Sequence, residues 1–152
     1  EGCFKYDDLC YPETGYSPYE RHFGTGVYGG DRWLDLDNIH STTDALVVLK
    51  DVNTGKKVRS QFIRKGDKLT MSNIPSGYYE LKMFLGNDWT YEKVMQCKLC
   101  AEYKIKGGFT KDIELKMNNK DLIKYASYES TLYNVEGGNV SSKSITIDEF
   151  LD

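Results

Sequence analysis

The chain lacks several features that would assign it directly to a functional class. Its longest clean apolar run is the five residues 45–49 (ALVVL), whereas a membrane-spanning helix needs about 20. Lys and Arg are scattered among Asp and Glu, and the net charge is −3, so no basic stripe is present to bind a phosphate backbone. These absences argue against membrane insertion and against nucleic acid as a partner.

Catalytic signatures are also missing. Only two histidines occur, His22 and His40. His40 lies close in sequence to Ser41 and Asp44, but proximity in sequence does not make a catalytic triad. No GxSxG motif is present, and the glycines of residues 23–30 (FGTGVYGG) lack the Lys-Ser/Thr ending of a phosphate-binding loop. We therefore predict a protein that is not an enzyme and that needs no cofactor.

Metal binding has one candidate segment, residues 31–38 (DRWLDLDN). Asp31, Asp35 and Asp37 supply the hard oxygen ligands that Ca²⁺ takes. The spacing does not match an EF-hand loop, and aspartates around a strand end commonly serve turn chemistry instead. We assign no metal and keep these three aspartates as the calcium candidates.

Tyrosine is the most over-represented aromatic residue. The chain has 12 Tyr against 6 Phe and 2 Trp. Tyr suits surfaces that become half-buried, although β-rich proteins also favour it. Residues 1–31 show no helical or strand period, yet they carry many rings, which predicts an arm that packs on its own domain or on a neighbouring subunit. The candidate assembly contacts are Tyr6, Tyr11, Tyr16, Tyr19, Phe23 and Tyr28.

Both tryptophans are candidates for ligand contact. Trp89 follows Asn87 and Asp88, so the ring could stack on a sugar while the polar neighbours bind hydroxyls; Trp33 is the second candidate. The alternative for Trp89 is that it closes the end of the core where the chain leaves a strand, with its N–H bonded to a carbonyl. We favour this structural role for residues 86–89 and keep a glycan as the alternative ligand.

Four cysteines form two local groups, Cys3 with Cys10 and Cys97 with Cys100. Two disulfides are natural in an exported protein. A four-thiolate zinc site is the second interpretation, because CxxC has the spacing of a zinc knuckle, but the wider first pair weakens it. A redox dithiol is the third. The connectivity of any disulfides stays open.

From about residue 33 the pattern changes to β. Residues 44–52 (DALVVLKDV) are apolar on both faces over the middle of the segment, which predicts a central strand covered on both sides. Further strands are expected over 57–64, around Leu69 and Met71, over 78–85 and over 109–117, where Phe109, Ile113, Leu115 and Met117 should point inward. Residues 87–108 are interpreted as a long connection. Segments 125–135 and 140–147 predict a final hairpin around residues 136–139 (EGGN).

About seven or eight short strands with regular turns favour an all-β fold. We expect an antiparallel β-sandwich of the immunoglobulin-like or prealbumin-like type over residues 32–152, preceded by the aromatic-rich arm of residues 1–31. No long amphipathic helix and no internal repeat is evident.

A family resemblance supports this fold. Residues 45–84 (ALVVLKDVNTGKKVRSQFIRKGDKLTMSNIPSGYYELKMF) resemble the transthyretin-like or carboxypeptidase-regulatory-like β-sandwich pattern, with a D-x-x-T-G-K turn followed by an I-P-x-G-x-Y-x-L strand. Residues 14–28, 63–66, 86–89 and 107–109 also resemble an uncharacterised group of exported bacterial domains of unknown function. The first resemblance implies an appended or assembling module of exported bacterial proteins; neither implies catalytic or ligand-binding residues.

These observations favour one functional hypothesis and one alternative. The chain begins with Glu1, so we expect either removal of a targeting segment or a piece of a longer protein. The leading hypothesis is a non-enzymatic bacterial assembly subunit, extracellular or on the cell surface, that binds other copies of itself through the arm and forms a filament or surface layer. The alternative is an accessory glycan- or cell-wall-binding module of a larger exported protein.

Overall fold

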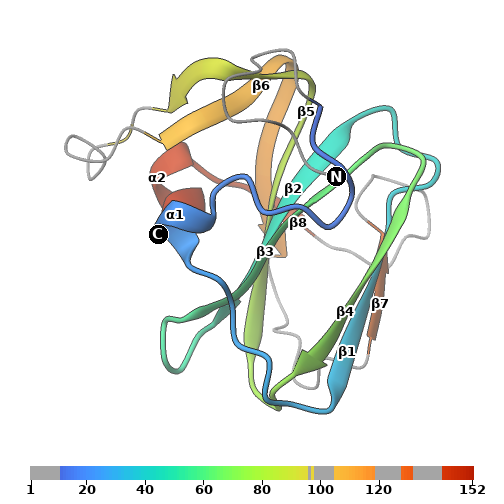
Figure 1. Cartoon of the computed structure of the whole chain (residues 1–152), viewed down its shortest axis with the longest axis vertical. Helices are drawn as coiled ribbons and strands as arrows, with labels where there is room; N and C mark the ends of the chain where they lie inside the picture. The colour runs from blue at the N-terminus through green and yellow to red at the C-terminus, as the bar shows by residue number, and fades with distance from the viewer. Residues whose placement is uncertain (1–10, 96, 98–104, 119–127, 132–141) are drawn as a thin grey trace.

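The computed structural model describes residues 11–95, 97, 105–118, 128–131 and 142–152. This part of the chain is mostly antiparallel β-sheet with two short helices (Figure 1). The elements are α1 (Glu20–Phe23), β1 (Arg32–Asp37), β2 (Asp44–Asp51), β3 (Lys57–Ile63), β4 (Lys68–Ile74), β5 (Tyr79–Met95), β6 (Ile105–Asn118), β7 (Tyr128–Thr131), β8 (Ser142–Ser144) and α2 (Ile147–Leu151). The all-β prediction is confirmed.

The strands form two sheets with the orders β4-β1-β7 and β3-β2-β5-β6-β8. Pairing is antiparallel except between β1 and β7, which run parallel. The predicted final hairpin is wrong, because β7 pairs with β1 in the small sheet and β8 pairs with β6 in the large one. Its expected turn, residues 136–139, lies outside the described residues. Alternation indicates a strand but carries no information about its partner, which explains this error.

Strand β2 is the central strand that its apolar run predicted. It pairs with β3 on one side and with β5 on the other, and all six residues 44–49 are buried. Successive side chains point to opposite faces of a sheet. Val47 and Leu49 accordingly join one hydrophobic cluster, while Leu46 and Val48 join another. The large sheet is therefore covered on both faces.

The inner cluster is made by residues of both sheets. Leu34 and Leu36 of β1 and Met71 of β4 pack with alternate residues of β2 and β5. Its members are Leu34, Leu36, Ala45, Val47, Leu49, Val58, Ile63, Met71, Ile74, Tyr79, Leu81, Met83 and Leu85. This cluster gives the two sheets a common core.

The outer cluster covers the opposite face of the large sheet and is rich in aromatic rings. Its members are Tyr19, Phe23, Leu46, Val48, Phe62, Phe84, Trp89, Met95, Ile105, Phe109, Ile145, Phe150 and Leu151. Helices α1 and α2 lie side by side over this face (Figure 1), and the rings of Phe23 and Phe150 meet edge-on with centroids 6.1 Å apart. Segments from both ends of the described chain thus complete one core.

Strand β5 is much longer than predicted. The expected connection over 87–108 is wrong, because β5 continues to Met95 and β6 starts at Ile105. Pairing with β6 is interrupted by register shifts after Leu85 and after Thr90, and Asp88 has a positive φ of 55°. Bulges bend and twist a strand pair, so the regular alternation that marks a strand in the sequence is lost here.

The same irregularity explains why one side chain of β6 is exposed where the sequence pattern predicted burial. Ile113 was expected to be buried but is 47% exposed. Between the pairs Leu85↔Glu114 and Asn87↔Lys111 strand β6 has one residue more than β5, and Asp112 there has a positive φ of 56°. The extra residue changes which side chains face the core.

Candidate interaction surfaces

The described part of the arm, residues 11–31, hydrogen-bonds to the edge of the large sheet. Gly15 N–H donates to the Phe62 carbonyl, and Phe62 N–H donates to the Tyr16 carbonyl, both at 2.8 Å. Further along, Val27 N–H donates to the Val58 carbonyl at 3.1 Å. An edge strand leaves backbone groups unpaired unless another segment covers it. The chain's own arm covers part of β3 in this way.

Two rings of the arm are buried in the outer cluster. Tyr19 is 1% exposed and Phe23 is also buried. The Tyr19 hydroxyl donates to the Gly107 carbonyl, which ties the arm to β6. Burial raises the pKa of the Tyr19 hydroxyl, because the phenolate loses its hydration there. These two aromatic side chains, one at each end of α1, anchor the arm.

The other arm candidates that the structure describes are partly exposed. Tyr11, Tyr16 and Tyr28 are each at least 40% exposed, and Tyr6 lies outside the described residues. The Tyr11 hydroxyl donates to Asp44 Oδ1 at 2.8 Å, and burial together with this hydrogen bond raises its pKa. The arm therefore divides its aromatic residues between anchoring positions and the surface.

Arg59 joins the arm to both sheets, and sequence reasoning missed it. Its guanidinium donates to the carbonyls of Val27 in the arm, Val58 in β3 and Ser72 in β4. The Tyr28 ring lies over it, with the guanidinium carbon 3.6 Å from the ring centroid. Arg59 is 2% exposed, and burial lowers its pKa. The sequence offers little sign of this role, because β3 (KVRSQFI) also contains Lys57, Ser60 and Gln61.

The C-terminal helix is fixed to the arm and to the sheet. A capping box starts α2, with Thr146 and Glu149 exchanging hydrogen bonds. At its other end the His22 ring nitrogen Nε2 donates to the Leu151 carbonyl at 2.9 Å, and Lys82 Nζ donates to the Glu149 carbonyl at 2.7 Å. Cationic or N–H donors at the last carbonyls of a helix are favourable.

Trp89 lies within the outer cluster. It is 8% exposed, and its ring contacts those of Phe62, Phe109 and Tyr19 at centroid distances of 5.4, 5.1 and 5.8 Å. Within the described part of the chain its Nε1–H has no hydrogen-bond acceptor, so the carbonyl expected for it is not found there. Burial raises the pKa of the neighbouring Tyr91 to about 12.

The polar neighbours of Trp89 serve the fold of the strand pair. Asn87 Nδ2 donates to the Thr42 carbonyl at 3.0 Å and to Asp112 Oδ2 at 2.9 Å. Asp88 forms an ion pair with Lys111 at 3.2 Å. The structure therefore places Asn87 and Asp88 around the bulged bend, away from any exposed face of Trp89.

Trp33 has the opposite environment. It is 48% exposed on β1, next to the buried Leu34, and therefore faces away from the inner cluster. Asp35 lies two residues further on the same face and accepts a hydrogen bond from Thr70 Oγ1 of β4. This outer face of the small sheet combines an exposed aromatic ring with a carboxylate and a hydroxyl. The structure does not bring Trp33 together with Trp89.

The calcium candidates do not converge. Asp37 Oδ1 accepts from the Ile39 N–H in a local turn, and Asp31 lies 3.6 Å from the Arg32 guanidinium. Within the described ranges, no group of three or more His, Cys, Asp or Glu side chains is arranged to hold a metal ion.

Cys97 is the one cysteine among the described residues, and it is not a free thiol. Cys3, Cys10 and Cys100 lie outside the described residues.

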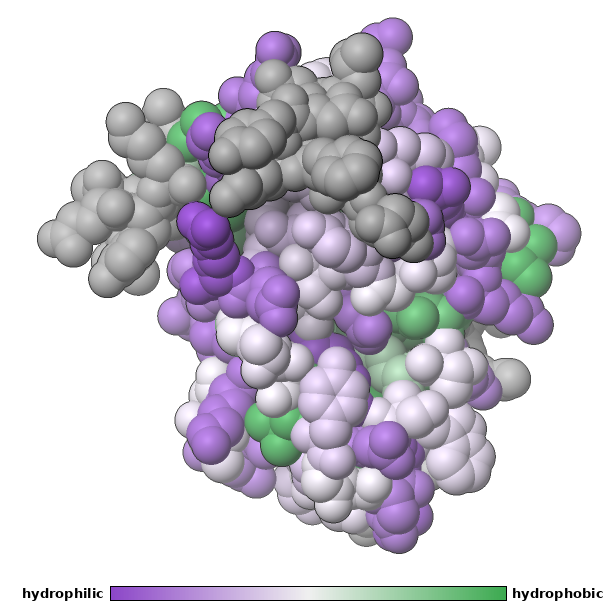
Figure 2. All heavy atoms as spheres, viewed as in Figure 1, coloured by the Kyte–Doolittle hydropathy of each residue, from purple (hydrophilic) through white to green (hydrophobic). Residues whose placement is uncertain are grey.

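The surface shown in Figure 2 is mostly pale or purple, with green atoms in small separate spots. Neither α1 nor α2 has the length and apolar character to cross a membrane.

Comparison of the chain with protein-family models, curated proteins and solved structures finds no match. The function must therefore be argued from the geometry described above.

Proposed function

We propose that the protein is a non-enzymatic, exported bacterial structural subunit that assembles with other copies of itself through its N-terminal arm. The observation that carries this proposal is the main-chain pairing of the arm with the edge of β3. Strand addition of this kind gives affinity through backbone hydrogen bonds and specificity through side chains in pockets. Tyr19 and Phe23 are the side chains that would supply that specificity.

Exchange of the arm between copies is the proposed mechanism. The same contacts form in trans when the arm of one copy docks on β3 of the next, so no new interface has to be created. Residues 23–30 contain four glycines, which give the connection to β1 the freedom to redirect the arm. A head-to-tail exchange that does not close produces a filament or a surface layer.

The proposed fold type and compartment accompany this function. We assign the two sheets to an antiparallel β-sandwich of the immunoglobulin-like or prealbumin-like type. The Tyr79 hydroxyl donates to the Pro75 carbonyl four residues upstream, at the start of β5, as in the tyrosine corner of such sandwiches. Two disulfides among Cys3, Cys10, Cys97 and Cys100 fit an extracellular or cell-surface location.

Size-exclusion chromatography with light scattering tests the assembly. The full chain is expected to form species larger than a monomer as its concentration rises, and a chain without residues 1–31 is expected to stay monomeric. The double variant Tyr19→Ser/Phe23→Ser keeps the whole chain and loses the anchors, so it covers the case in which the truncated chain fails to fold. Tyr16→Ser is the matched control, because Tyr16 is 40% exposed and is not a member of the outer cluster. Monomers throughout, with equal stability, would contradict the proposal.

The alternative function is glycan or cell-wall binding, and the exposure of Trp33 is what favours it. A flat aromatic ring beside a carboxylate and a hydroxyl is suited to stacking on a sugar and bonding its hydroxyls. Titration of tryptophan fluorescence with cell-wall sugars tests it, with Trp33→Ala as the variant. A fluorescence change that persists in that variant, or none in the parent chain, would contradict it.

A further inference from the structure

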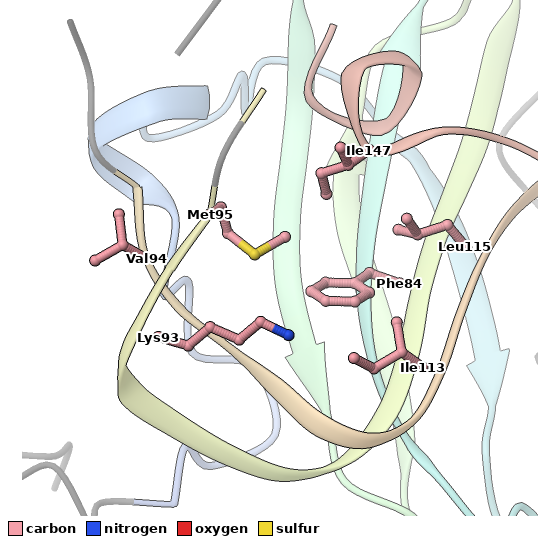
Figure 3. A pocket seen from close by; sticks show the side chains of 7 residues that line it. All are labelled: Phe84, Lys93, Val94, Met95, Ile113, Leu115 and Ile147. Carbon is pink, nitrogen blue, oxygen red and sulfur yellow. The ribbon is translucent and has the colours of Figure 1, made fainter. Parts of the chain in front are cut away.

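A hollow of about 320 Å³ opens on the outer-cluster side of the large sheet (Figure 3). Strands β5 and β6 and the start of α2 form its walls. Six of the seven lining residues are apolar, and the seventh is a lysine: Phe84, Lys93, Val94, Met95, Ile113, Leu115 and Ile147. The hollow is thus apolar, open to the surface and supplied with one cationic group.

The lysine is held within the hollow. In Figure 3 the Lys93 side chain runs along the wall and its Nζ points toward the space between Met95, Phe84 and Ile113. Nζ donates to the Phe109 carbonyl at 2.8 Å. A Cβ at Gly108 would lie 3.0 Å from Lys93 Cδ and 3.2 Å from Met95 Sδ, so the glycine provides room for this arrangement.

The described residues supply no counter-charge to Lys93. Among the described residues, no carboxylate lies within ion-pair distance of its Nζ. An ammonium has three N–H donors, and the Phe109 carbonyl uses one of them. A cation beside an apolar surface gains from an anionic partner that satisfies its remaining donors, because a hydrogen bond between two charged groups is stronger than one between neutral groups.

We propose that the hollow binds a small amphiphile with one anionic head group, of the class of medium-chain alkyl carboxylates. The head group would accept hydrogen bonds from Lys93, and the alkyl chain would pack on Phe84, Leu115 and Ile147. The volume lies at the lower end of the roughly 300–1,000 Å³ typical of small-molecule sites, which favours a short alkyl chain over a long-chain lipid. This site is separate from the arm contact with β3.

Calorimetric titration of the full chain with three ligands tests the site. Decanoate, decan-1-ol and decyltrimethylammonium share an alkyl chain and differ in head-group charge. Decanoate is expected to bind at least about tenfold more tightly than decan-1-ol, since one charge-assisted hydrogen bond contributes that much. Decyltrimethylammonium is expected to bind more weakly than decan-1-ol, because Lys93 repels it.

Two variants locate the binding. Lys93→Met should remove the preference for decanoate over decan-1-ol, and Lys106→Met is its control, since Lys106 is exposed on β6 and does not line the hollow. Ile113→Asp is a second variant. It places a negative charge at the edge of the hollow without changing a buried residue. Ile113 is already exposed, so the chain should stay folded while the added carboxylate weakens decanoate binding at least about tenfold.

Several outcomes would overturn the proposal. No heat of binding with decanoate would exclude the ligand class, and equal binding of all three ligands would show an unspecific apolar surface. Equal weakening by Lys106→Met and Lys93→Met would show a general charge effect. If the full chain self-associates and Ile113→Asp alone prevents it, the occupant is a second copy. The decanoate titrations do not depend on whether the arm exchanges, so the two proposals can fail separately.

Discussion

The two faces of the large sheet are packed by different means. The inner cluster consists almost wholly of aliphatic side chains that the strands themselves supply. The outer cluster takes rings from the arm, from the bent end of β5 and β6, and from α2. Strand pairing therefore suffices to assemble one face, whereas the other is complete only when segments from distant parts of the chain are docked.

This difference separates two kinds of stability. Loss of the inner cluster removes the contact between the sheets and must unfold the domain cooperatively. Release of the arm opens the outer cluster and leaves the paired strands of the inner face in place, which is a sub-global opening. An arm that can leave without unfolding the domain is also what exchange between copies requires.

The largest expected effect comes from the inner cluster. Leu34→Ala removes a fully buried side chain that joins β1 to the large sheet, and it should lower the free energy of unfolding by about 2–5 kcal/mol. Urea denaturation measures this loss. Ile39→Ala is the control, because Ile39 is exposed just after β1 and should change stability by less than about 0.5 kcal/mol. If Leu34→Ala reduced hydrogen-exchange protection only at the amides of the arm, the cooperative role of this cluster would be contradicted.

A smaller effect is expected where the two regions meet. Arg59→Met removes the donors of three backbone carbonyls, which cannot be replaced by apolar groups, so the loss should be about 2–3 kcal/mol. Hydrogen exchange should show lost protection around Val27 together with global destabilisation. Lys57→Met on the same strand is the control, because it removes a positive charge and leaves the three Arg59 hydrogen bonds in place. Unchanged stability of Arg59→Met would show that these hydrogen bonds contribute nothing net.

Much of the inner cluster could be predicted from the sequence, because its strands alternate or are apolar throughout. The run 45–49 predicted β2 and its burial on both faces, and the role of Trp89 in closing the core was favoured over ligand contact. The outer cluster was harder to predict. Its bulges at Asp88 and Asp112 hide the period of β5 and β6, and the sequence spacing of Phe23 and Phe150 gives no sign that they touch.

The candidate contacts show the same division. The arm of residues 1–31 was recognised by its rings, but which rings are buried depends on where β3 and α2 lie. Arg59 was missed because a lone arginine in a strand is usually solvated, and its carbonyl partners come from three separate segments. The hollow around Lys93 depends on the bend of β5, which the sequence pattern does not reveal.

Alkaline pH should destabilise the outer face, where Tyr91 packs against the outer cluster. The pKa of Tyr91 is raised to about 12, above the value of about 10 in an unfolded chain. Its contribution is fully present below about pH 10 and is lost as the pH rises toward 12, by about 1–2 kcal/mol after allowance for partial exposure. Absorbance of tyrosinate and hydrogen exchange of the arm measure this. Tyr91→Phe should weaken the effect; an identical pH profile in that variant would contradict the assignment.

A single hydroxyl tests how the arm is anchored. Tyr19→Phe keeps the buried ring and removes the hydrogen bond to the Gly107 carbonyl, so the docking free energy of the arm should fall by about 1 kcal/mol. Hydrogen exchange of residues 11–31 should reveal the change, whereas amides of β2 should keep their protection. Tyr16→Phe is the matched control on the same arm. Equal loss of protection in β2 would show that arm and sheet open together.

The smallest expected effect on stability lies outside both clusters. Trp33→Ala removes a ring that is 48% exposed on the small sheet, so the free energy of unfolding should change by no more than about 0.5 kcal/mol. Thermal unfolding measures this directly. A large loss of unfolding free energy would mean that Trp33 stabilises the sheet and is not a free ligand-binding residue. If stability is unchanged and sugar binding is lost, the exposed face of β1 binds the sugar. Self-assembly is then the role of the arm only.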